Sequence, residues 1–171
     1  MELSTIIDYL DKVCDGNSLI SKGGALMSTK ELQEKIVSNM KKWQKIEELS
    51  IESTGQIMEK TQNPVIKLVM EMINNDSKFH NRVQGFIADS LEKEAIVFST
   101  DELGDIWDMI EHHIKLEKET VRLAHEALDA LKGKKMLIQE YLINYLLEDE
   151  EKHNTLLEKL ENIKSGIYPY A

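Results

Sequence analysis

The sequence predicts an all-α protein with one main domain. Apolar residues recur at three- and four-residue steps along most of the chain, and no stretch alternates apolar and polar residues as a half-buried strand would. Only two prolines and eight glycines occur in 171 residues, so long helices can run without interruption. A composition of 42% hydrophobic and 30% charged residues is typical of a chain that folds around a core.

Two long helices are expected in the first half of the chain, after a short helix over about residues 3–14. The first long helix begins at Ser28, which forms a capping box with Glu31, and it ends before Pro64. Pro64 cannot continue a helix, but it suits the first turn of the next one. The expected inward stripe of the first long helix is Ile36, Met40, Trp43, Glu47, Ile51, Thr54 and Met58. That of the second is Ile66, Val69, Ile73, Asp76, His80, Val83, Ile87 and Leu91.

Two further helices are expected in the second half. Residues 99–102 supply the cap of the third helix, Gly133 ends it, and the fourth helix runs over about residues 135–164. The stripe of the third helix is Leu103, Ile106, Ile110, His113, Glu117, Val121, Ala124 and Leu128. That of the fourth is Tyr141 or Ile143, Leu146, Glu150, His153, Leu157 and Leu160. Short connections predict two antiparallel αα-hairpins, joined by a longer crossover around residues 93–102.

Charge and hydropathy exclude several classes of function. A formal net charge of −10 argues against nucleic-acid binding and against anionic membranes, because both need a basic surface. No apolar run approaches the roughly 18 residues that span a bilayer, and the first residues include Glu2 and Asp8 where a signal peptide would be basic. Cys14 is the only cysteine, so an internal disulfide and a Cys-x-x-Cys metal centre are excluded. We therefore expect a soluble, cytoplasmic protein.

Acids and histidines occupy inward positions on four separate helices, which predicts a buried metal site. The plainest case is Glu150 and His153, which lie three residues apart and therefore share a helix face. Glu117 lies on the preceding helix, and Glu47 and His80 repeat much of the arrangement in the first hairpin. Such groups would cost several kcal/mol if they were buried without partners. Carboxylate oxygens combined with imidazole suit Fe(II) or Mn(II).

The chain also repeats itself. Residues 46–51 match residues 116–121, each with a glutamate followed three positions later by serine or threonine. Residues 76–81 match residues 149–154, each with an aspartate four positions before a histidine and asparagine pair. Two related hairpins that face each other would form a bundle with approximate two-fold symmetry, with the site on its axis.

Glu117 followed by Glu150-x-x-His153 on the next helix, with Glu47 and His80 in the first hairpin, resembles the ligand set of the ferritin-like di-iron carboxylate proteins, which include rubrerythrin and bacterioferritin and carry a glutamate and a Glu-x-x-His motif twice. The resemblance covers about residues 30–164 and is strongest in the second hairpin. It implies an antiparallel four-helix bundle over residues 28–165, with residues 1–27 as a helix and loop before it and residues 166–171 as a tail. Ser77 departs from the pattern, which has a bridging glutamate there, and Asp76 is the nearest substitute. The candidate metal ligands are Glu47, Asp76, His80, Glu117, Glu150 and His153.

The resemblance also implies a function. Two iron ions are expected, with manganese or zinc as alternatives, and they would react with oxygen or peroxide as in ferroxidases or peroxidases. Electrons would come from a separate donor, and a homo-oligomer, most simply a dimer, is expected. Two alternatives stay open: a helical scaffold or interaction protein without metal, and one zinc held by His80, His153 and carboxylates. His113, one turn before Glu117, is a candidate extra ligand or hydrogen-bond donor, although a histidine that is partly exposed or has its partners within the core is the simpler interpretation.

Overall fold

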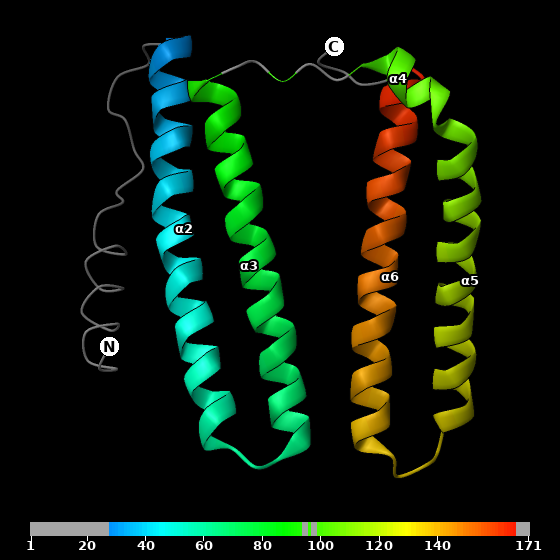
Figure 1. Cartoon of the computed structure of the whole chain (residues 1–171). Coiled ribbons are helices and arrows are strands. Elements are labelled where there is room, and N and C mark those ends of the chain that lie inside the picture. The colour runs from blue at the N-terminus through cyan, green and yellow to red at the C-terminus, as the bar shows by residue number, and fades with distance from the viewer. Residues whose placement is uncertain (1–27, 94–95, 97–98, 167–171) are drawn as a thin grey trace, which may run out of the picture. The chain divides into compact units, whose positions relative to one another are not determined.

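The computed structural model describes residues 28–93, 96 and 99–166. All secondary-structure elements of these residues are helices, which confirms the all-α prediction for this part of the chain (Figure 1). They are α2 (Thr29–Lys60), α3 (Pro64–Glu92), α4 (Thr100–Asp105), α5 (Trp107–Leu131) and α6 (Leu137–Lys164). The helix expected over residues 3–14 and the end of the tail, residues 167–171, lie outside the described residues. Two compact units, residues 1–96 and 97–171, divide the chain and are described separately.

The first unit is an antiparallel hairpin of α2 and α3, and its helix ends are those that the sequence predicts. The side chain of Ser28 accepts a hydrogen bond from the Glu31 amide at 3.3 Å, and the Glu31 carboxylate accepts one from the Ser28 amide at 2.8 Å. This capping box satisfies amides that have no partner within the helix. At the start of α3, Asn63 accepts from the amide of Val65 at 2.9 Å, and Pro64 occupies the first helical position.

Polar side chains, rather than apolar ones, form much of the contact between α2 and α3. We call them the polar seam: Gln44, Glu47, Ser50 and Thr54 on α2, and Asn74, Ser77, Asn81 and Gln84 on α3. The amide of Asn74 donates to the Thr54 hydroxyl at 2.8 Å, and the Ser77 hydroxyl donates to Ser50 at 2.9 Å. Because buried polar groups are costly without partners, these pairs specify how the two helices align.

The polar seam lies on a face of α3 next to its predicted apolar stripe. The residues of α3 that pack against α2 and are buried are Asn74, Ser77, Gln84 and Ala88. Ile73, Val83 and Ile87, on the predicted stripe, are 36–40% exposed. Within this hairpin α3 therefore meets α2 with its polar face and leaves part of the apolar stripe exposed, and the inward orientation of the stripe in a bundle stays a prediction.

The second unit contains α4, α5 and α6. Ser99 caps α4 and accepts from the Glu102 amide at 3.1 Å, as predicted. The prediction of one continuous helix from this cap is wrong, because the backbone of Ile106 leaves the helical region (φ −103°, ψ 3°) and α5 begins at Trp107. At the break Trp107, rather than the predicted Ile106, is the buried residue, and Ile106 is exposed. The ammonium nitrogen of Lys164 lies 4.2 Å from the centroid of the Trp107 ring.

Helices α5 and α6 form a second antiparallel hairpin (Figure 1). Gly133 adopts a positive φ of 73° in the turn between them, where glycine has no steric cost. Leu146, predicted to face the centre of the bundle, is 51% exposed, and its inward orientation stays a prediction. No helix in the described ranges has both the length and the apolar character needed to cross a membrane.

Candidate metal centre

The candidate centre is built around Glu117, which the regular three- and four-residue spacing of α5 turns toward α6. Glu117 is only 8% exposed, which is unusual for a residue with a carboxylate. Each carboxylate oxygen meets an imidazole: Oε1 lies 2.9 Å from Nε2 of His113, and Oε2 lies 3.3 Å from Nδ1 of His153. The buried acid is therefore compensated on both sides.

Helix α6 supplies the other two groups. Glu150 and His153 lie one turn apart on the same face, and Oε2 of Glu150 is 3.4 Å from Nδ1 of His153. Both side chains are only partly exposed, 24% for Glu150 and 39% for His153. One ligand atom from each of Glu117, Glu150 and His153 lies within 4.8 Å of the other two. This is the one group of its kind found among the described residues.

The separations match those around a single ion. Donor atoms bound tetrahedrally at roughly 2.1 Å from an ion lie about 3.4 Å apart. The distances of 3.3 and 3.4 Å from His153 Nδ1 to the two carboxylate oxygens agree with this value. Two carboxylate oxygens and an imidazole nitrogen repel one another unless a proton or a cation lies between them. The arrangement can therefore hold either.

Glu150 is disposed to remain ionised. A hydrogen bond with the Glu117 carboxyl lowers the pKa of Glu150 below its ordinary value, and Thr120 and His153 act in the same direction, whereas partial burial opposes them. A metal ion would therefore meet a carboxylate that is already charged, because carboxylates bind metals in their deprotonated form.

In the first hairpin the structure brings together two of the three predicted ligands. Glu47 is buried, and its Oε1 lies 3.5 Å from Nδ1 of His80, which is exposed. The Gln84 amide donates to the same oxygen at 3.2 Å. Asp76 is exposed on α3, whereas its neighbour Ser77 is buried against α2. Within this hairpin Asp76 therefore lies apart from Glu47. Its role as a metal ligand in the centre of a four-helix bundle stays a prediction.

Several residues of the two clusters were not expected from the sequence. Gln84 donates its amide to Glu47, and the Thr120 hydroxyl, which donates to the main-chain carbonyl of Glu117 at 2.7 Å, also lies beside Glu150; neither side chain carries a charge. One signal could have identified Gln84: it lies seven positions after Ser77 and therefore on the same face of α3. The sequence indicates Asp149 only through the internal repeat. Its Oδ2 lies 3.7 Å from Nε2 of His153.

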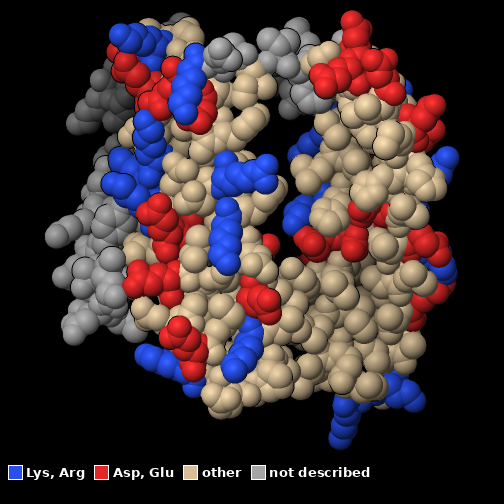
Figure 2. Space-filling model, in the orientation of Figure 1, with Lys and Arg blue, Asp and Glu red and all other residues tan. Residues whose placement is uncertain are grey.

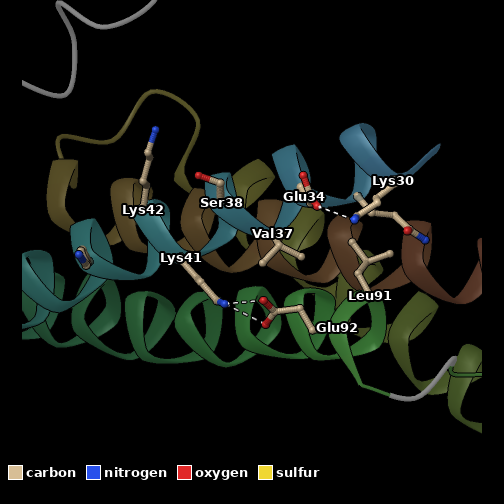
Figure 3. Close-up of a pocket in the computed structure, with 10 residues that line it drawn as sticks. Lys30, Glu34, Val37, Ser38, Lys41, Lys42, Leu91 and Glu92 are labelled. Atoms are coloured by element: carbon tan, nitrogen blue, oxygen red, sulfur yellow. Dashed lines mark hydrogen bonds and ion pairs between the residues drawn. The ribbon is translucent and has the colours of Figure 1, made fainter. Parts of the chain in front are cut away.

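The α2–α3 hairpin also carries a groove of about 550 Å³ (Figure 3). Its lining residues are Lys30, Gln33, Glu34, Val37, Ser38, Lys41, Lys42, Lys45, Leu91 and Glu92. Lys41 pairs with Glu92 at 2.6 Å, and Lys30 pairs with Glu34 at 3.8 Å. The groove has no histidine, and its acids face lysines, so it does not have the donor set of a metal site.

The geometry thus unites Glu117, Glu150 and His153 in one cluster and Glu47 with His80 in another. The first cluster has the donor atoms of a metal centre, and the second has one carboxylate and one imidazole. We compared the chain with protein-family models, with curated proteins and with solved structures, and none of them matches it.

Proposed function

We propose that the α5–α6 hairpin binds a divalent transition-metal ion through Glu117, Glu150 and His153. The observation that carries the proposal is the convergence of two carboxylate oxygens on Nδ1 of His153, at 3.3 and 3.4 Å. Two oxygens and one imidazole nitrogen suit Fe(II), Mn(II) and Zn(II). Three protein ligands leave coordination positions open for water or an oxidant.

The complete fold and reaction are also part of the proposal. Both hairpins expose apolar side chains that need a cover. In the first hairpin these include Trp43, Ile57, Ile66, Ile73, Phe79, Val83, Phe86 and Ile87, and in the second Met109, Leu116, Leu123, Tyr141, Leu146 and Leu156. Figure 2 shows a broad area without charge on the visible face of the α5–α6 unit, whereas charged residues are scattered over the visible face of the α2–α3 unit. We propose that the hairpins form a ferritin-like four-helix bundle.

In such a bundle Glu47 and His80 would complete a two-iron centre that reacts with oxygen or peroxide. The Glu47 to His80 distance of 3.5 Å, close to the 3.3 Å between Glu117 and His153, supports this symmetry. The electron donor would be a separate protein.

A metal-free scaffold is the second candidate function. It is favoured by the first hairpin, where Gln84 and His80 already compensate Glu47. In that case a proton on His153 takes the place of the ion in the second hairpin, and the two clusters are salt bridges that hold helices together.

Metal titration of the full chain separates these candidates. Protein purified without oxygen and freed of metal by a chelator is melted with and without Fe(II), Mn(II) or Zn(II). An ion present at about 100 times its Kd stabilises the native state by about 2.7 kcal/mol, so the melting temperature should rise. Glu150→Ala should remove this rise, whereas Glu151→Ala, at the exposed neighbouring position, should keep it. Wild-type protein that binds no metal at saturation would reject the metal proposal.

A further inference from the structure

We infer that the groove of the α2–α3 hairpin is a docking surface for residues 3–14 of the same chain. Docking there is independent of the proposed metal site, which lies in the other unit. The groove combines an apolar floor with two lysines that lack an acidic partner within the described ranges. Residues 3–14 combine an apolar stripe with acids beside it. The two surfaces are therefore complementary in both apolar character and charge.

The floor of the groove is apolar. Val37 on α2 is 8% exposed, and Leu91 on α3 is partly buried and also lines the groove (Figure 3). The hairpin leaves a volume of about 550 Å³ unfilled above these side chains. Aliphatic side chains that enter this space would remove apolar surface from water, and the methylene stems of the surrounding lysines extend that surface. The groove therefore favours an occupant with a row of aliphatic residues.

The rim of the groove is positively charged. Two of its four lysines pair with the two glutamates that line the groove. The other two, Lys42 and Lys45, have no acidic partner in the part of the chain that the structure describes. They lie three positions apart and therefore project from the same side of α2. In a chain with 31 acidic and 21 basic residues, this pair is a local excess of positive charge. An occupant with carboxylates beside its aliphatic row would match it.

The expected helix over residues 3–14 has this pattern. Its apolar residues recur at three- and four-residue steps and form one stripe: Leu3, Ile6, Ile7, Leu10, Val13 and Cys14. Helical spacing places Asp8, Asp11 and Asp15 together on one flank of the stripe. The same spacing places Lys12 on the opposite face, away from the stripe. As a helix, the segment would therefore present aliphatic side chains and carboxylates in adjacent rows.

The lengths of the two surfaces are also compatible. A helix over residues 3–14 would be about 18 Å long, and the part of α2 that lines the groove, from Lys30 to Lys45, is about 22 Å long. Residues 15–27 connect the segment to Ser28 at the start of α2, and they span up to about 43 Å when extended. So short a connection gives the segment a high effective concentration at the groove. Contacts too weak to hold a separate molecule are then sufficient.

Hydrogen exchange of the full chain, in metal-free protein, tests this docking. An isolated helix of this length is marginal in water, so strong protection of the amides of residues 7–14 requires a docked segment. Replacing Lys42 and Lys45 together by glutamate should accelerate their exchange by about 10-fold, because attraction becomes repulsion. Lys115→Glu with Lys118→Glu, an exposed pair with the same spacing on α5, is the matched control and should leave the rates unchanged.

Two alanine variants test the apolar contact. Ile6→Ala removes a side chain from the stripe, whereas Thr5→Ala changes a position on the opposite face of the expected helix. Both substitutions raise the intrinsic helix propensity. In a docked segment, Ile6→Ala should nevertheless accelerate the exchange of residues 7–14 by about 5-fold, because apolar burial is lost. Thr5→Ala should slow it or leave it unchanged. Slower exchange in both variants would indicate an undocked helix and would overturn the proposal.

Reversing the charges on both surfaces identifies the partners. Asp8→Lys with Asp11→Lys, added to the double lysine variant, should restore protection, because the ion pairs form again with exchanged signs. The exchange of the α2 and α3 amides verifies that the hairpin is intact in each variant. Wild-type residues 7–14 that exchange as in an unfolded peptide, or protection that the lysine variant does not change, would overturn the proposal. Protection that rises with protein concentration would also overturn it, because the segment would then dock on a second copy.

Discussion

The two hairpins differ at one pair of facing positions. In the α5–α6 hairpin Glu150 faces Thr120, whereas in the α2–α3 hairpin Ser77 faces Ser50. These positions correspond in the internal repeat. In the first hairpin two hydroxyls satisfy each other at 2.9 Å, and no charge is added. In the second hairpin Glu150 places a second carboxylate beside Glu117. A cation between the two carboxylates would be favourable. One side chain thus separates a neutral contact from a candidate ion site.

The buried glutamates of the two hairpins also differ in the groups that they contact. Glu47 receives a hydrogen bond from the Gln84 amide, whereas the corresponding position in the second hairpin is Leu157. Glu117 instead lies between His113 and His153. An amide donor cannot be replaced by a metal without leaving a buried group unpaired, but an imidazole can turn its lone pair to an ion. The first hairpin therefore satisfies its buried glutamate with an amide, whereas in the second two imidazoles lie beside the buried glutamate, in keeping with the proposed ion site.

The largest effect is expected from giving the first hairpin the missing acid. Ser77→Glu places a carboxylate at a position within the polar seam that is 5% exposed. Without metal the free energy of unfolding should fall by about 2–4 kcal/mol, since the new charge is buried without a cation. Urea unfolding with and without Zn(II) measures this, and the ion should recover part of the loss. Ser77→Ala, which loses only a hydrogen bond of about 1 kcal/mol, is the control. Equal stability of the two variants would contradict the comparison.

A smaller loss is expected when Gln84 is replaced by the leucine of the second hairpin. Gln84→Leu removes the amide that donates to Glu47 at 3.2 Å. Hydrogen bonds to charged groups contribute about 1.5–3 kcal/mol, so stability should fall by about 2 kcal/mol. Combining it with Glu47→Gln should cost less than the two single losses added together, because the carboxylate that needed the donor is gone. Additive losses in urea unfolding would show that the two side chains act independently.

A further test uses pH and the second hairpin. The pKa of Glu150 is lowered from its ordinary value of 4.5. This adds stability that is fully present above the pKa of the unfolded chain and is lost as pH falls through the lower native value. The stability difference between wild type and Glu150→Gln should therefore shrink between pH 6 and pH 3 in metal-free protein. Glu151→Gln, at an exposed position, should show a smaller change over the same range.

The smallest effect is expected at Gly85. A Cβ there would lie 3.0 Å from the side-chain nitrogen of Gln44, which donates to Asn81 in the polar seam. Gly85→Ala gains up to about 1 kcal/mol of helix propensity but displaces this amide, so the net change should stay below about 1 kcal/mol. The hydrogen exchange of the Gln44 side-chain amide should accelerate even when the melting temperature is unchanged. An unchanged exchange rate would mean that Gln44 moves without losing its partner.

Much of the candidate site could be predicted because it depends on local spacing. Glu150 and His153 share a face of α6 for any chain in a helix, and Glu117 follows from the periodicity of α5. The prediction was wrong at Ile106, where the helix breaks and Trp107 takes the buried position. The face of α3 that meets α2 could not be predicted from the apolar stripe, because amides and hydroxyls have no signature in such a stripe.

The sequence by itself determined the elements that require only neighbours along the chain. The capping box of Ser28, the helix start at Pro64 and the turn at Gly133 each follow from the geometry of a few consecutive residues. Only the tertiary structure decided that Ser77 rather than Asp76 is buried and that Gln84 reaches Glu47. Neighbouring residues on α3 offer faces of similar quality, and the choice between them depends on which hydrogen bonds the opposite helix can complete.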